Sequence, residues 1–588
     1  MKLGHATRHR SLVRNLLFAT VLGWLCVGLG AAVPAARPHI VVVVLDDVGF
    51  SDLGAYGSEI ATPHLDAIAA AGVRFTNFHT APMGQLTQVM LHSGIDHHRA
   101  MSRTLGAAPA SPILSLGGLA RGNGYATVFA GTWHLGKGLA GAPGAQGWDH
   151  YFALDATPAD HLGVPLPALS TLESAWWADG HQAPMSAQFH PNVSPVDHLI
   201  GHVQQGLASG RPILAMLAFQ AVQAPPHTSE AARAEALARY SAGWDAVRQQ
   251  RLARQRAMGL LPVGQTEQAT WQAEWAALNT AERNDQAQRM AQYAAMLGQV
   301  DQQVGRLRQL LAQAGQLDNT VFVVLSGNGA DAAVTPAPVA GAQRAQERVL
   351  PTGARLPLHP GPRWAAVSNT PLPRGKGTVA EGGIRVPFIL SAPGRLPAGT
   401  LNNQFVYVTD VLPTLLDLAG IRLSDAALDA QRLQRPSGKS MLPALQGHEA
   451  AVHPPEEVIG YEGPGGQALF KGRYKLARET GPGANAPWQL FDLANDPAQA
   501  QNLVDAQPDV AHELAQAMAR YLLISGANPP SSGKASAPIM PPDSGIMLMA
   551  HWAPALVAAV LGLLALRMAG MMVYRWWRQS RQGSSGPG

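Results

Sequence analysis

The hydrophobic pattern of the chain alternates between short, continuous apolar runs and longer stretches of helical periodicity. Residues 39–45 form an unbroken, mostly β-branched run, which is typical of a strand buried on both faces of a parallel sheet. Residues 320–325 form a second run of this kind. Before it, apolar residues recur at three- and four-residue spacing, which predicts an amphipathic helix: Tyr293, Met296, Val300, Val304, Leu307 and Leu311. Strand and helix in alternation predict a doubly wound α/β domain.

Polar residues follow each of these strands directly. Asp46 and Asp47 come after the first run, and a Ser-Gly-Asn-Gly segment at 326–329 comes after the second. Ligands of open α/β sheets bind at the carboxyl ends of the strands, and adjacent carboxylates suit a hard cation such as Ca²⁺ or Mg²⁺. Paired acids at a strand end are also found in helix caps and solvated turns, so the pattern alone leaves both interpretations open.

The pattern of predicted helices and strands changes near residue 400. We expect a large mixed-sheet domain of the doubly wound α/β class, flanked by helices, at 37–400, and a smaller α+β subdomain at 401–524. The smaller part contains a capped helix at 410–420 and strand-like segments at 468–470 and 474–477. Residues 331–375 are rich in Ala, Pro and Gly, which predicts a long surface excursion.

The two ends of the chain carry membrane signals. A basic segment precedes the apolar stretch 16–33, and small residues follow it, so 1–36 is predicted to be a secretory signal, with an uncleaved anchor helix as the alternative. A Pro-, Ser- and Gly-rich linker is expected at 525–545 and a transmembrane helix at 546–566. The basic tail 567–588 is then expected in the cytoplasm, with the body exported to the periplasm and held by the membrane.

Composition narrows the function classes. Apolar residues make up 47% and charged residues 14%, which is a globular composition with membrane segments added. The formal net charge is +4, and the basic residues form no stripe interleaved with aromatics, so nucleic acid is not expected as a partner. The one cysteine, Cys26, lies inside the predicted signal. The mature protein would therefore contain no disulfide.

Five segments in order carry a family resemblance. They read VVVLDDVGFSDL at 42–53, ATPHLD at 61–66, GVRFTNF at 72–78, GTWHLG at 131–136 and EGGIRVP at 381–387. From about residue 39 to about residue 520, the chain resembles arylsulfatases of the sulfatase family, within the alkaline-phosphatase-like superfamily.

The resemblance implies a mechanism and a set of site residues. In the family, a Cys or Ser becomes formylglycine, whose hydrate attacks the sulfate sulfur, and calcium held by three Asp and one Asn positions the sulfate. An Arg, two Lys and two His balance charge and move protons. Asp46, Asp47 and Asn328 match the metal ligands, and His134 and Lys376 match two of the other groups.

Other functional positions depart from the family pattern. The nucleophile motif, Cys/Ser-x-Pro-x-Arg, aligns with 84–88, where Gly84 replaces the nucleophile, Leu86 the Pro and Gln88 the Arg. The remaining departures replace a Lys, a His and the third metal Asp: Thr132, Gln223 and Gly327. No formylglycine is expected, because glycine has no side chain to convert. Loss of a carboxylate also weakens the expected Ca²⁺ site.

These residues support three hypotheses. The first is a membrane-anchored pseudoenzyme whose pocket, with Lys376 and His134, binds a small anionic or sulfated ligand. The second is an active, metal-dependent sulfate or phosphate ester hydrolase that uses Thr87 or a metal-bound water. The third is a purely structural membrane protein. The acid pair has two interpretations as well: either it holds a weakly bound cation, or Lys376 or His134 neutralises it directly.

Overall fold

The computed structural model describes residues 37–101, 114–135, 142–154, 175–183, 189–223, 228–261, 270–332, 347–349, 355–357, 360–430, 433–463, 465–481 and 484–525. The predicted signal at 1–36, all but the first residue of the predicted linker, the predicted transmembrane helix and the predicted tail lie outside these residues. Among the helices of the described ranges, none combines the length and the apolar character needed to cross a bilayer.

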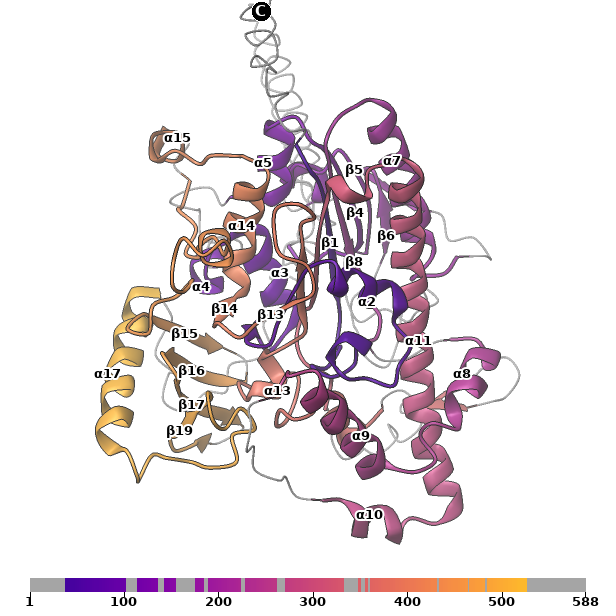
Figure 1. The fold of residues 1–588 in the computed structure, drawn as a ribbon, viewed down its shortest axis with the longest axis vertical. Coiled ribbons are helices and arrows are strands. Elements are labelled where there is room, and N and C mark those ends of the chain that lie inside the picture. The colour runs from indigo at the N-terminus through magenta and orange to yellow at the C-terminus, as the bar shows by residue number, and fades with distance from the viewer. Residues whose placement is uncertain are drawn as a thin grey trace, which may run out of the picture.

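A ten-stranded mixed sheet forms the centre of the molecule (Figure 1). Its strands, in spatial order, are β13 (Thr400–Asn402), β2 (Val73–Phe75), β12 (Phe388–Ser391), β9 (Thr320–Ser326), β1 (His39–Leu45), β8 (Ile213–Ala218), β4 (Ala126–Thr132), β5 (His150–Leu154), β6 (Trp176–Ala178) and β7 (His181–Gln182). The five strands from β9 to β5 run parallel, whereas β12 and β6 pair antiparallel with their neighbours in this group. The predicted mixed α/β sheet is confirmed.

The central strand β1 is buried along its whole length, as its sequence predicts. Ile40, Val42 and Val44 point into one hydrophobic core, and the alternate residues Val41 and Val43 point into the other. Since burial of each aliphatic side chain contributes about 1.5–3 kcal/mol, the strand stabilises both layers at once.

Helices cover both faces of the sheet (Figure 1). One face packs against α2 (Pro63–Ala70), α7 (Ser194–Ala208), α11 (Thr280–Gln313) and α12 (Pro362–Ser368). The other packs against α3 (Gly84–Ser93), α5 (Leu116–Gly122) and α14 (Val411–Leu418). Further helices are α4 (His97–Met101), α8 (Glu230–Leu237), α9 (Trp244–Ala257), α10 (Gln272–Ala277), α13 (Glu381–Ile384), α15 (Asp425–Ala430) and α16 (Leu442–Leu445).

The predicted amphipathic helix is the C-terminal part of the longer α11. It begins after Asn279, whose side chain accepts from the Glu282 amide at 3.0 Å while the Glu282 carboxylate accepts from the Asn279 amide at 2.8 Å. This reciprocal cap satisfies two amides that the first turn leaves without helical partners. All six apolar positions predicted from spacing are buried.

One boundary prediction needs correction. The excursion predicted for 331–375 ends earlier, because α12 buries Trp364, whose indole N–H donates to the Gln286 carbonyl at 2.7 Å. Near the expected division at residue 400, β13 pairs within the main sheet and α14 belongs to the main core. The short strand β14 (Val406–Tyr407) also pairs with β3 (Phe78–His79) of the main domain.

A second, antiparallel sheet forms the smaller α+β part. It contains β15 (Val458–Gly463), β16 (Gly466–Lys471), β17 (Tyr474–Gly481), β18 (Ala484–Asn485) and β19 (Gln489–Asp492), and α17 (Pro508–Ser525) packs across it (Figure 1). The strand-like segments at 468–470 and 474–477 lie in β16 and β17, as predicted. A separate hairpin pairs β10 (Glu347–Val349) with β11 (Arg355–Pro357).

A buried ion cluster joins this second sheet to the main domain. Glu381 of α13 accepts from Lys475 Nζ of β17 at 2.7 Å, and His79 Nε2 lies 3.0 Å from its other oxygen. Lys475 and Glu381 are both fully buried. Burial pushes the pKa of Glu381 up, but the charge of Lys475 pulls it further down, so the carboxyl stays ionised.

We expect Lys475→Met to lower the free energy of unfolding by about 3–5 kcal/mol, because it removes the cation nearest to the buried Glu381 carboxylate and leaves only Arg385, 3.5 Å from Oε2, to balance its charge. Lys471→Met is the matched control, since Lys471 pairs with Glu513 at the surface and its loss should cost less than about 1 kcal/mol. Urea unfolding of both variants measures the difference. Equal destabilisation would show that the Glu381 cluster does not fix the two sheets together.

Candidate functional site

The residues singled out in the sequence converge at the carboxyl ends of the parallel strands. Asp46 and Asp47 follow β1, Gly327 and Asn328 follow β9, and Thr132 ends β4. Backbone bonds hold these ends together, because the Asp46 amide donates to the Ala221 carbonyl beyond β8 at 3.1 Å and the Gly327 amide donates to the Leu45 carbonyl at 2.8 Å. The sheet therefore brings the predicted metal ligands into one place.

Asp47 is neutralised by a lysine. Its Oδ1 accepts from Lys376 Nζ at 2.6 Å and from Asn328 Nδ2 at 2.8 Å. Burial acts to lower the pKa of Lys376, but attraction to Asp47 and Asp46 outweighs it and raises that pKa above its ordinary value. Lys376 therefore makes the direct contact with Asp47 that one of the two interpretations of the acid pair expects.

The charge of Asp46 is neutralised in a different way from that of Asp47. Burial and the neighbouring charge of Asp47 raise the pKa of Asp46 to about 8, so a proton neutralises this carboxyl at pH 7 when no cation is bound. Burial, helped by the charge of Lys376, lowers the pKa of His134 to about 4. His134 is consequently a neutral imidazole at pH 7 and contributes no positive charge to a bound anion.

The two glycines of the site lie next to one another beside Asp46. A Cβ on Gly84, the first residue of α3, would lie 3.2 Å from Asp46 Oδ1 and 3.3 Å from Asn328 Oδ1. Position 84 is therefore aimed at the acid pair, as a nucleophile would be. A Cβ on Gly327 would lie only 3.1 Å from Gly84 Cα. Backbone occupies the space next to the missing third carboxylate.

Neutral side chains fill the positions of the expected Arg and Lys. Gln88 is buried in α3, and its Nε2 donates to Thr132 Oγ1 at 3.4 Å. Thr132 Oγ1 in turn lies 3.4 Å from the Ala218 carbonyl at the end of β8. Gln223, at the position expected for a His, lies half-buried after β8. This chain of weak hydrogen bonds supplies no positive charge for a sulfate group.

The remaining residues of the nucleophile segment serve the core. Leu86 is buried in the main hydrophobic core, where the family motif has Pro. Thr87 is completely buried, and its Oγ1 accepts from the Ala81 amide at 3.0 Å. The hydroxyl of Thr87 is thus bonded to the backbone of its own segment, and no contact joins it to Asp46, Asp47 or Asn328 within the described residues.

The oxygen atoms of the acid pair suit a hard cation in part. Asp47 Oδ2 and Asn328 Oδ1 are buried and have no hydrogen-bond partner, which is costly for polar atoms unless a ligand satisfies them. Together with the Asp46 carboxyl, they would hold a divalent cation, whose role would be to neutralise the two carboxylates. Calcium takes about six to eight oxygens, and three side chains with a competing ammonium make a weakened site.

Tyr293 supports the loop that carries the acid pair, and the sequence did not predict this role. The Tyr293 hydroxyl lies 3.0 Å from the Asp47 carbonyl and 2.6 Å from Asp52 Oδ2, and Arg251 Nη1 contacts Asp52 Oδ1 at 2.6 Å. This buried network fixes the loop after β1. Tyr293 counted only as an apolar helix position, although a phenol on a buried helix face usually finds a hydrogen-bond partner.

Comparison with known proteins shows the family of this chain. The sequence profile of the Sulfatase family matches residues 38–421, and the C-terminal profile of N-sulphoglucosamine sulphohydrolase matches 375–523. The chain belongs to the sulfatase family. An uncharacterized sulfatase of Schizosaccharomyces pombe is 30% identical over 526 residues, which cover 81% of this chain and 92% of that protein. The arylsulfatase of Klebsiella aerogenes is 29% identical, covering 68% of this sulfatase-family chain and 91% of the relative.

Solved structures share the fold of this sulfatase-family chain. The crystal structure of Ps i-CgsB has a TM-score of 0.59 at 22% identity and covers 82% of this chain and 92% of that chain. PsFucS1 sulfatase from Pseudoalteromonas sp. has a TM-score of 0.57 at 18% identity, with 84% and 92% covered. At these identities the likeness shows the α/β fold alone.

The raised pKa of Asp46 predicts a pH dependence of stability in chelator-treated buffer. The folded pKa of about 8 lies above the ordinary value of 3.8, so the folded state holds a proton that the unfolded state releases. The contribution is full below pH 4 and is lost as pH rises toward 8, by at most about 1.4 kcal/mol per pH unit. Asp46→Asn, which cannot titrate, should remove this decline. The free energy of unfolding is measured with urea between pH 5 and 8 for both proteins. If it changes with pH in the same way in both, the decline does not come from Asp46.

Proposed function

We propose that this member of the sulfatase family is a pseudoenzyme that keeps the arylsulfatase-like fold without the formylglycine reaction. The observation that carries the proposal is the position of Gly84, which is aimed at Asp46 and Asn328 and offers no side chain. Covalent attack on sulfur needs an oxygen nucleophile at that point. The chain supplies only an α-carbon there.

The electrostatics of the pocket support the same proposal. A sulfate ester in its transition state needs fixed positive charge, and loss of a single such donor typically costs a factor of about 10²–10³ in rate. Gln88 and Thr132 are neutral, His134 is neutral at pH 7, and Lys376 is paired with Asp47. Little positive charge is left to stabilise the transition state.

Thr87 does not provide an obvious replacement for the nucleophile. Its hydroxyl is buried against the Ala81 backbone, and a rotation toward the acid pair would leave the Ala81 amide without this acceptor. A water bound to a divalent cation at Asp46, Asp47 and Asn328 is the remaining route to hydrolysis, and the activity assay below tests it directly.

Binding without turnover is the use that we propose for the pocket. A sulfated ligand fits the family: Ps i-CgsB is described in complex with k-i-k-neocarrahexaose, and another structural neighbour with its substrate D-glucosamine-2-N,6-O-disulfate. For this chain, Lys376 is the cationic group proposed to meet the ligand, and Ca²⁺ is the cation proposed for the acid pair. An incoming anion would share Lys376 with Asp47.

We further propose that the body is exported and anchored in the membrane. This part of the proposal rests on the sequence: the secretory signal at 1–36, the apolar segment 546–566 and the arginine-rich tail after it.

The activity assay compares the purified full chain with its Asp46→Ala/Asp47→Ala double variant on an aryl sulfate and the matching aryl phosphate, with Ca²⁺ present. We expect no turnover above the double variant, because Gly84 offers no nucleophile and Gln88 and Thr132 supply no positive charge beyond that of Lys376 and the bound cation. Turnover that the double variant abolishes would overturn the pseudoenzyme proposal and show a metal-dependent reaction. Turnover abolished by Thr87→Ala alone would identify Thr87 as a nucleophile.

The binding assay titrates glucosamine 6-sulfate into the full chain and into Lys376→Ala. We expect the substitution to weaken binding at least about 10-fold, since a charge-assisted contact contributes about 1.5–3 kcal/mol. Lys439→Ala is the control, because Lys439 pairs with Glu457 at the surface. An affinity that Lys376→Ala leaves unchanged would exclude Lys376 from the ligand site.

A further inference from the structure

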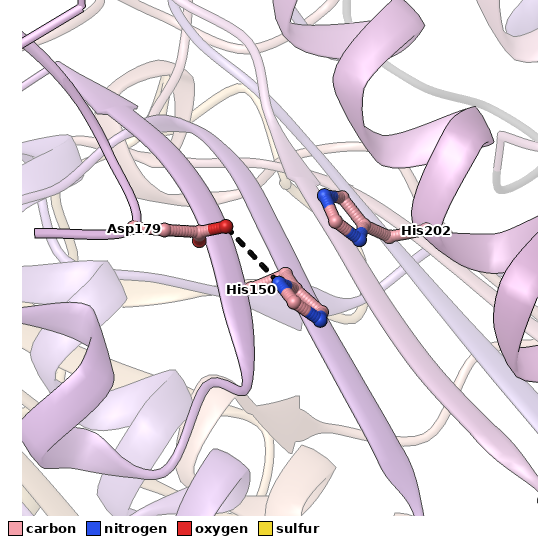
Figure 2. A group of neighbouring side chains, drawn as sticks. All are labelled: His150, Asp179 and His202. Carbon is pink, nitrogen blue, oxygen red and sulfur yellow. Dashed lines mark hydrogen bonds and ion pairs between the residues drawn. The ribbon is translucent and has the colours of Figure 1, made fainter.

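A second cluster of titratable side chains lies at the β5–β7 edge of the main sheet. His150 begins β5, Asp179 lies in the turn between β6 and β7, and His202 lies on α7 (Figure 2). One ligand atom from each of these three residues lies within 4.8 Å of the others. Three elements of the fold thus bring two imidazoles and a carboxylate together.

The backbone fixes Asp179 in position. Asp179 and Gly180 have φ values of 45° and 91°, as an Asp-Gly hairpin turn requires. Asp179 Oδ1 accepts from the Tyr151 amide at 2.6 Å, while Oδ2 lies 3.0 Å from His150 Nδ1 (Figure 2). One carboxylate oxygen is held by the sheet, and the other is directed at the imidazole.

Helix α7 contributes a second imidazole pair. His198 and His202 are four residues apart, which places them on one face of the helix, and their ring centroids lie 4.6 Å apart. His198 Nε2 and His202 Nδ1 are both buried and have no hydrogen-bond partner. Burial lowers the pKa of both residues, so both rings are neutral at pH 7 and have a nitrogen lone pair. Neutral imidazoles are metal ligands.

This cluster is separate from the sulfatase centre. Val128 pairs with His150 and Thr132 with Leu154 in the parallel β4–β5 ladder, so His150 and Thr132 lie at opposite ends of it. Four residues of strand separate the two levels by about 13 Å. The acid pair at the carboxyl end of β1 therefore shares no side chain with this cluster.

We propose that His150, Asp179 and His202 bind a divalent transition metal of the Zn²⁺ type, with His198 as a candidate fourth ligand. Imidazole nitrogen with one carboxylate oxygen is a donor set that suits zinc and its neighbours rather than calcium. The metal would tie α7 to the β5–β7 edge of the sheet.

Binding requires a small rearrangement of the rings. The His150 and His202 rings are stacked, with centroids 3.8 Å apart and planes 14° apart. The lone pair of an imidazole nitrogen lies in the ring plane, so one ring has to turn before both can point at a shared ion. His202 is half-exposed and Asp179 is at the surface, which leaves space for this movement.

The test uses the full chain, stripped of metal with a chelator and titrated with Co²⁺, whose visible bands report nitrogen coordination, and with Zn²⁺. We expect one equivalent to bind and Zn²⁺ to raise Tm. His202→Gln and Asp179→Asn should each weaken binding at least about 10-fold and reduce the Tm shift. His512→Gln, at an exposed position of α17, is the matched control and should behave as the unaltered chain.

The outcome is separable from the sulfatase proposal. The Asp46→Ala/Asp47→Ala variant should bind the same equivalent, because the two sites share no ligand. Equal affinities for the unaltered chain, His202→Gln and Asp179→Asn would overturn the metal site, as would no bound Co²⁺ at all. If Asp46→Ala/Asp47→Ala no longer binds the one equivalent of Co²⁺, the ion belongs to the acid pair, and the proposal is overturned as well.

Discussion

Two adjacent carboxylates lie at the buried end of the central strand, and the surrounding groups are arranged so that their charge is balanced. Strand β1 must be apolar because it is buried on both faces, and its direction delivers Asp46 and Asp47 into a place with little water. A proton neutralises Asp46, whose pKa is raised to about 8, and Lys376 neutralises Asp47 at 2.6 Å. The proton and the lysine each reduce the free-energy cost of keeping a carboxylate charge away from water.

Glycines and neutral side chains lie beside the acid pair in this pocket. Gly84 and Gly327 have no side chains, and a Cβ on Gly327 would lie 3.1 Å from Gly84 Cα. Gln88 and Thr132 form a neutral pair next to the acid pair. Lys376 balances the charge of Asp47, and Gln88 and Thr132 add no further charge to the pocket.

Comparison with other buried charges in the chain shows what is unusual about the pocket. Glu381 is paired with Lys475 and Arg385 and hydrogen-bonded to His79, and Asp52 is paired with Arg251 and hydrogen-bonded to Tyr293. Those clusters hold loops and sheets in place. The pocket differs because two of its oxygens, Asp47 Oδ2 and Asn328 Oδ1, have no hydrogen-bond partner. Unsatisfied acceptors beside a carboxyl whose pKa is raised by burial and by Asp47 are what a cation would correct.

The sequence alone determined the buried strand β1, the helix at 293–311, the α/β class and the family, because apolar periodicity and ordered motifs are local properties of the chain. It also located the acid pair at the end of that strand. The pairing of Lys376 with Asp47, the support from Tyr293 and the convergence of His150, Asp179 and His202 were decided only by the tertiary structure. These residues are distant in sequence, and pairing register and helix packing, which no local pattern encodes, bring their side chains together.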